Sequence, residues 1–281
     1  MFVDLDRARI FFDTVGPALE PVGERMEQRP ALICLHGGPG FDHTTLRPYF
    51  DRFADTHQVI YLDHRGNGRS SGEFADMNLD QWADDIADIC AAMGIAKPVV
   101  FGQSFGGMVA MHYGARHPDG PSKLILSSTA ARMRYDVTLD IFERLGGIEA
   151  RAVAQRNWDD MSLEAFEEYE RVCLPLYNRK PDPQAAAAMK RAIKKRDVTV
   201  HFFENELKAM DLRPAMAKIT CPTLIIGGTE DPITPRICAE ELAEALDGRA
   251  QLEIFEGSGH GSYRDDPEGS ETLLREFLTE G

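Results

Sequence analysis

The alternation of short apolar runs with longer helical patterns constrains the fold of this 281-residue chain more than any other feature. Six runs are continuously apolar, which is typical of strands buried on both faces of a parallel sheet. Helical patterns, with apolar residues at three- and four-residue spacing, lie between them. The sequence therefore predicts an α/β fold with a mostly parallel central sheet and flanking helices. The six predicted strands are 31–36, 58–63, 98–103, 123–128, 222–228 and 250–257.

Two regions depart from this alternation. The N-terminal segments FVDLD and RIFFDTV fit an antiparallel hairpin added to one edge of the sheet. Residues 132–216 contain helical patterns only, divided by loops that carry Gly146 and Gly147. We therefore expect a core domain formed by residues 1–131 and 217–281, and a helical cap, or lid, domain formed by residues 132–216.

Charge and cysteine usage limit the partners of the chain. A formal net charge of -15 argues against nucleic acid and anionic membrane surfaces, because both require a basic footprint. No apolar run reaches membrane-spanning length, and acids stand near the N-terminus where a signal peptide needs bases. The five cysteines include no CxxC pair, so neither a disulfide framework nor a zinc site is predicted. We expect a cytoplasmic protein that needs no metal or cofactor and takes a small-molecule or short-peptide substrate.

A serine follows the third predicted strand directly and precedes a helical pattern. Ser104 lies in GQSFGG, with Gly102 and Gly106 at the outer positions of a G-x-S-x-G motif. A sharp turn between strand and helix makes a serine hydroxyl project from the carboxyl edge of a sheet, and the glycines leave room for that turn. We predict that Ser104 is a catalytic nucleophile.

A serine nucleophile needs a general base and an acid that orients this base. Asp231 follows the fifth predicted strand, in TEDPITP, and His260 follows the sixth, in the small-residue loop GSGHG. The sequence therefore predicts a triad of Ser104, Asp231 and His260. Two alternatives stay open at this point: Glu230 competes for the role of the acid, and Asp231 can also cap the helix that follows it.

A glycine-rich loop, HGGPG, follows the first predicted strand. Acyl transfer requires backbone N–H donors for the oxyanion, one from such a loop and one from the residue after the nucleophile. We assign these donors to Gly38 and Phe105. The alternative is that the glycines and Pro39 only form a tight turn.

Five motifs together resemble the α/β-hydrolase superfamily, and specifically its proline iminopeptidase-like branch. The resemblance implies the α/β-hydrolase fold, with a helical cap inserted after the sixth strand of that fold. It also implies a serine hydrolase with Ser104, Asp231 and His260 as its triad. The motifs are HGGPG at 36–40, YLDHRGNGRSSG at 61–72, GQSFGG at 102–107, GGTEDPITP at 227–235 and GSGHGSYRDDPE at 257–268.

The sequence departs from this branch near the site. Members usually carry glutamine at the position of His64 and tryptophan at that of Phe105, and they bind the substrate amine with glutamates of the cap and of the acid loop. Here proline follows Asp231 instead of an acid. In the cap we predict that Glu204 contacts substrate, and we interpret most of the other acids as a solvated helix face: Glu164, Glu167, Glu168, Glu170 and Glu206.

The motif YLDHRGNGRSSG has no assigned chemical role. We interpret it as a structural loop beside the site, in which Asp63 and Arg65 pair with each other.

Three functions are consistent with these residues. The first is an aminopeptidase similar to proline iminopeptidase, and the second is a carboxylesterase or lactonase on the same triad. The third is a slow-turnover ligand receptor on a hydrolase fold. All three would use the site around Ser104, because a fold alone does not select a substrate.

Overall fold

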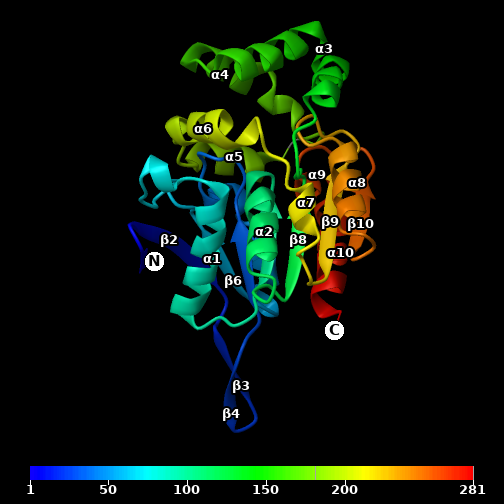
Figure 1. The fold of residues 1–281 in the computed structure, drawn as a ribbon. Helices are drawn as coiled ribbons and strands as arrows, with labels where there is room; N and C mark the ends of the chain where they lie inside the picture. The colour runs from blue at the N-terminus through cyan, green and yellow to red at the C-terminus, as the bar shows by residue number, and fades with distance from the viewer. Residues whose placement is uncertain (181, 281) are drawn as a thin grey trace.

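The protein is described here from a computed structural model that covers residues 1–180 and 182–280. Within these residues one sheet has the spatial order β1 (Phe2–Leu5), β2 (Ala8–Val15), β6 (Gln58–Leu62), β5 (Ala31–Leu35), β7 (Val99–Gln103), β8 (Lys123–Ser127), β9 (Thr223–Gly228) and β10 (Ala250–Phe255). Strands β1 and β2 pair antiparallel at one edge, and β2 pairs antiparallel with β6. All other pairs are parallel. The predicted fold class and the predicted edge hairpin are both confirmed (Figure 1).

The central strands are buried on both faces, as their continuous apolar pattern predicts. Leu32 and Cys34 of β5 belong to the core on one side of the sheet. Ile33 and Leu35 belong to the core on the other side, because successive side chains of a strand point to opposite faces. Each of these four side chains is at most 1% exposed.

Helices cover both faces of the sheet. The α1 helix shows why they form where they do: Asn78 caps its first turn by accepting the N–H of Gln81, and Gly94 ends it in a left-handed conformation with φ 67°. The elements outside the long insertion are η1 (His43–Leu46), η2 (Tyr49–Asp55), η3 (Phe74–Asp76), α1 (Leu79–Met93), α2 (Phe105–Arg116), α7 (Arg213–Met216), α8 (Arg236–Ala245), α9 (Ser262–Asp265) and α10 (Pro267–Thr279).

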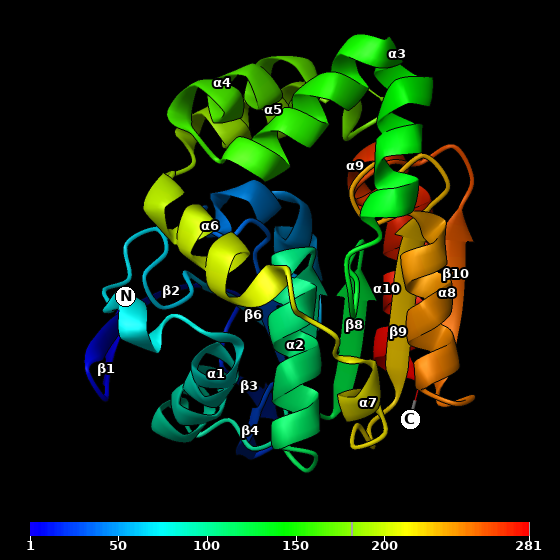
Figure 2. The ribbon, with the colours of Figure 1, turned by 45° about the horizontal axis from the view of Figure 1, so that its top comes forward.

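The segment between β8 and β9 is helical, as expected, and Figure 2 shows α3, α4, α5 and α6 lying beyond one end of the sheet. Gly147 interrupts the first helix with φ 75° and ψ -176°. Phe142, Ala150 and Tyr169 belong to a small apolar core separate from the two cores of the sheet. The elements up to α7 are α3 (Tyr135–Asp160), α4 (Leu163–Val172), η4 (Leu174–Leu176), α5 (Pro183–Arg191), α6 (Arg196–Phe202) and η5 (Phe203–Leu207).

A second, two-stranded sheet was not predicted from the sequence. Strands β3 (Leu19–Val22) and β4 (Arg25–Gln28) form an antiparallel hairpin that projects from the end of the molecule opposite the helical insertion (Figure 1). Its side chains are mostly exposed, so it lacks the buried apolar pattern by which the other strands are recognised. Across the described ranges, no helix is both long and apolar enough to span a bilayer.

Candidate active site

Ser104 lies on the sharp turn between β7 and α2. Its backbone has φ 56° and ψ -120°, a strained conformation for a residue with a side chain. A Cβ atom on Gly106 would lie well inside 3.0 Å of the carbonyl oxygen of Leu35, and one on Gly102 would approach the carbonyl of Gly106 as closely. The turn therefore requires both glycines. The amide of Ser104 donates to the carbonyl of Ser127 at 3.0 Å, which fixes the turn to the neighbouring strand β8.

His260 and Asp231 form a buried pair, 4% and 0% exposed. Nδ1 of His260 lies 2.9 Å from Oδ2 and 3.1 Å from Oδ1 of the carboxylate. The N–H groups of Ile233 and Thr234 donate to Oδ1 at 2.8 and 2.9 Å, and the Thr234 hydroxyl donates to Oδ2 at 2.8 Å. Because an ionised carboxylate only accepts, Nδ1 carries the imidazole proton and Nε2 is left to accept one.

The alternative acid, Glu230, lies outside this pair. Its carboxylate accepts from Arg144 of α3 at 2.6 Å and has no contact with His260. The two adjacent acids in TEDPITP thus have different partners.

The two predicted oxyanion donors come from separate loops beside Ser104. Phe105 is the first residue of α2, and N–H groups of a first helical turn have no partner inside the helix. Gly38 lies in the loop after β5, which α6 holds in place. The Thr199 hydroxyl donates to the carbonyl of Pro39 at 2.7 Å, and the Lys195 amide donates to that of Gly40 at 2.6 Å.

Ser104, His260 and Gly38 line one cavity with a volume of about 160 Å³. Sequence reasoning found these three residues but missed most of the lining, since the insertion contributes it through tertiary packing. Apolar side chains dominate: Met133, Trp158, Met161, Phe166, Leu174, Met189 and Phe203. The cavity is therefore suited to an apolar group next to Ser104.

The structure places the acids of the insertion differently from the sequence interpretation. Glu204 is exposed on η5 and is not among the residues that line the cavity. Glu170, which we interpreted as part of a solvated helix face, lines the cavity instead. Its carboxylate accepts from Lys194 Nζ at 2.5 Å. Within the described part of the chain, the only carboxylate of the lining is thus already paired with a cation.

His260 is also held by residues that the sequence did not single out. Its amide donates to the carbonyl of Tyr177 at 2.6 Å, and its carbonyl accepts from Asn178 and Arg264, both at 3.2 Å. Tyr177 and Asn178 belong to the insertion, so only tertiary packing places them here. Arg264 was visible in the motif GSGHGSYRDDPE, four residues after His260, where a following helix would return it to the site.

Asp63 and Arg65 do not pair with each other, contrary to the sequence interpretation. Arg65 is 1% exposed and forms two hydrogen bonds to Asp85 of α1, at 2.6 and 2.9 Å. A buried guanidinium needs a carboxylate that can meet its fork of N–H groups, and α1 supplies one. Neither Asp63 nor Arg65 lines the cavity.

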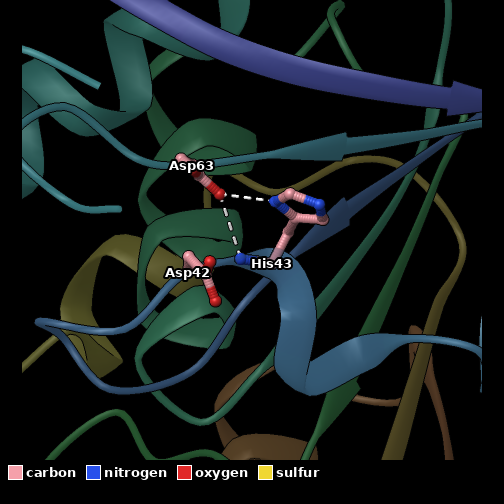
Figure 3. A group of neighbouring side chains, drawn as sticks. All are labelled: Asp42, His43 and Asp63. Atoms are coloured by element: carbon pink, nitrogen blue, oxygen red, sulfur yellow. Dashed lines mark hydrogen bonds and ion pairs between the residues drawn. The ribbon is translucent and has the colours of Figure 1, made fainter. Parts of the chain in front are cut away.

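Asp63 belongs instead to a buried group with Asp42 and His43 (Figure 3). Its Oδ1 accepts from Nδ1 of His43 at 2.6 Å and from the His43 amide at 3.0 Å. Its Oδ2 accepts the amide of Arg69, whose guanidinium also bonds Asp42 at 2.8 Å. Burial alone would raise the pKa of Asp63, but the His43 bond and the neighbouring histidines outweigh burial and lower the pKa. Because donors already occupy the oxygens of Asp63, we interpret the group as a structural link between the loop after β5 and the loop after β6.

Two buried histidines lie beside the loop that carries Gly38. His36 donates through Nδ1 to the carbonyl of Gly37 at 2.7 Å, and its Nε2 accepts the amide of His64 at 3.3 Å. Burial lowers the pKa of both imidazoles. The His64 ring packs against Phe105 with 5.2 Å between centroids. The neutral His36 ring thereby fixes the peptide unit that carries the Gly38 amide.

The structure has a mostly parallel sheet, a strained serine at a strand-to-helix turn, and a histidine that lines the same cavity as this serine and pairs with a buried aspartate. These features define the class of hydrolases built on an α/β sheet. The family comparison agrees: the model for the alpha/beta hydrolase fold matches residues 30–267. The chain therefore belongs to the alpha/beta hydrolase fold family, and it is a hydrolase.

Named relatives include both peptidases and lactonases. A proline iminopeptidase of Lactobacillus helveticus is 29% identical over 279 residues, which cover 92% of each chain. The crystal structure of proline iminopeptidase from Mycobacterium smegmatis has a TM-score of 0.79 at 21% identity, covering 99% of this chain and 97% of that one. The enol-lactonase of Burkholderia xenovorans has a TM-score of 0.72 at 23% identity, covering 100% of both chains. The resemblance to the proline iminopeptidase-like branch thus has support in sequence as well as fold.

Proposed function

We propose that the chain is a serine hydrolase that cleaves a carboxylic ester or amide bond of a small substrate through an acyl-enzyme. Ser104 is the nucleophile, His260 the general base and Asp231 the acid that orients it. The observation that carries the proposal is that His260, which is paired with the buried Asp231, lines the same cavity as a serine held in a strained turn.

The proposed reaction has two steps. Nε2 of His260 removes the Ser104 proton as the oxygen attacks the substrate carbonyl, and the amides of Gly38 and Phe105 stabilise the oxyanion. His260 then gives the proton to the leaving group, and the acyl-enzyme forms. Water attacks the acyl-enzyme with His260 again as base, which releases the acid and restores Ser104.

The lining favours an ester or lactone with an apolar, uncharged acyl group. Trp158, Met161 and Phe166 carry no ionisable group. A substrate ammonium at Glu170 would share this carboxylate with Lys194 Nζ, which bonds Oε1, and the two cations would repel each other. An uncharged acyl group avoids this cost, since it requires no ionic partner.

A second candidate is removal of an N-terminal residue from a short peptide. It is favoured by the 29% identity with a proline iminopeptidase over 92% of both chains. Glu170, or Glu204 after a movement of η5, would then receive the substrate amine.

The helical insertion has a place in this function. We propose that residues 132–216 act as a cap domain on a core of residues 1–131 and 217–281. The separate apolar core around Phe142 supports this division. We also propose that the protein works in the cytoplasm, where its five buried, unpaired cysteines would stay reduced.

The test is a hydrolytic panel run on the wild type and on Ser104→Ala together. The panel contains a prolyl arylamide, short-chain aryl esters and an acyl lactone. Turnover of at least one substrate is expected, with a loss of about 10⁴-fold or more in Ser104→Ala. Full activity of the variant would refute the proposal. Failure of a fluorophosphonate to label Ser104 would instead favour a slow-turnover receptor.

A further inference from the structure

Arg264 is a charged residue of the catalytic cavity that the proposed reaction does not use. It lies on α9, four residues after His260, and its side chain lines the cavity. Nη1 donates to the carbonyl of His260 at 3.2 Å, and Nη2 donates to that of Thr45 at 3.1 Å. The guanidinium also lies 4.7 Å from the centre of the Tyr263 ring. These contacts hold the guanidinium beside the general base.

The positive charge of Arg264 has no ionic partner in residues 1–180 and 182–280. No carboxylate oxygen there lies within 4.0 Å of its guanidinium, whereas the other charged lining residue, Glu170, is paired with Lys194. The cavity therefore contains one uncompensated cation. A guanidinium has five N–H donors, and the two carbonyl bonds leave donors free for a ligand.

Arg264 and Thr45 also line a second cavity, with a volume of about 540 Å³. This cavity lies between η2 and the segments that carry Lys180 and Asp266. The two cavities adjoin at Thr45 and Arg264. The larger cavity adds room on the side of Arg264.

The chemistry of the proposed reaction decides which half of the substrate lies on the side of Arg264. His260 must protonate the leaving group, so the leaving group lies next to His260 when the bond breaks. Arg264 is bonded to His260 itself, while the apolar lining formed by Trp158 and Phe166 is on the insertion. The acyl group therefore belongs under the insertion, and the leaving group belongs beside Arg264.

We propose that Arg264 binds a carboxylate on the leaving group, so that the enzyme selects esters or amides whose alcohol or amine product carries a carboxylate. The proposal rests on the proposed function of Ser104 and His260. A planar guanidinium suits this ligand, because it meets a carboxylate with two parallel hydrogen bonds.

The test compares two esters with the same acyl group, 4-acetoxybenzoate and 4-acetoxybenzamide. For each enzyme the ratio of their kcat/KM values is measured, which cancels the intrinsic reactivity difference when variants are compared. In Arg264→Gln the kcat/KM for the benzoate, divided by that for the benzamide, should fall by about 10- to 100-fold, mainly because KM for the benzoate rises. Arg264→Lys should recover part of it. Lys218→Gln, which removes an exposed cation outside both cavities, should leave the ratio near that of the wild type.

The outcomes separate this proposal from the one it rests on. If the wild type hydrolyses neither ester and Ser104 resists labelling, the proposed function is wrong. If both esters are hydrolysed and Arg264→Gln keeps the wild-type ratio, Arg264 has only a structural role and the inference is wrong. Phenyl hydrogen succinate carries its carboxylate on the acyl side. A loss in Arg264→Gln that is confined to this ester would overturn the assignment to the leaving group.

Discussion

Replacing Asp231 by asparagine tests the proposed catalytic pair at a single atom. Oδ1 of Asp231 accepts the amides of Ile233 and Thr234, so the oxygen of the new side chain must take that place. The NH₂ group then replaces Oδ2, which lies 2.9 Å from Nδ1 of His260. Two donors would face each other there, which favours the imidazole tautomer with its proton on Nε2. That tautomer cannot accept the Ser104 proton.

The expected loss in kcat is about 10³- to 10⁴-fold, or roughly 4 to 5.5 kcal/mol of transition-state stabilisation. Steady-state hydrolysis of the best ester of the panel measures it, with thermal unfolding to show that the variant is folded. The matched control is Glu230→Gln, which changes the adjacent acid that pairs with Arg144. A folded Asp231→Asn that keeps kcat within tenfold of the wild type, or an equal loss in Glu230→Gln, would refute the reasoning.

Three further changes test the scaffold. Gly106→Ala would place its Cβ too close to the carbonyl oxygen of Leu35, so urea unfolding should show a loss of about 1 to 3 kcal/mol in the free energy of unfolding, and kcat should be lower. A variant with unchanged stability and kcat would contradict the close packing. Asp85→Asn leaves the buried charge of Arg65 without its partner and should cost about 3 kcal/mol in the same assay, whereas a loss under 1 kcal/mol would mean that the charge is solvated. Burial lowers the pKa of His64, so below about pH 6.5 the unfolded state takes up a proton that the native state does not, and the free energy of unfolding falls by up to about 1.4 kcal/mol per pH unit. His64→Gln should therefore reduce the dependence of stability on pH in this acid range. An unchanged dependence would mean that another group causes it.

The sequence was informative wherever function depends on the end of a strand. Ser104 and Asp231 each follow a continuous apolar run, and His260 follows β10, in which Gln251 and Glu253 are exposed. The carboxyl ends of parallel strands meet at one edge of a sheet. Recognising the strands was therefore enough to predict that the three residues lie near one another. Glycine spacing was equally local evidence, since the turn at Ser104 leaves no room for a Cβ on Gly102 or Gly106.

Pairings across distant segments were harder to predict. Arg65 lies two residues from Asp63, but its partner is Asp85 on α1, and only the packing of α1 against the sheet brings the two charges together. The β3–β4 hairpin was missed for another reason. Its strands have no buried face, and hydrophobic periodicity records burial rather than strand geometry.

By itself, then, the sequence determined the α/β sheet, the helical insertion and the order of the candidate catalytic residues, because each follows from local periodicity, turn chemistry and position along a strand. Tertiary structure alone decided what surrounds Ser104. In the structure Glu204 does not line the cavity, Glu170 pairs with Lys194, and Arg264 lies beside His260. The cavity brings together residues up to 227 positions apart in the sequence, such as Gly37 and Arg264. A helical pattern shows that a residue lies on a helix, but how that helix packs on the sheet decides whether the side chain meets solvent or substrate.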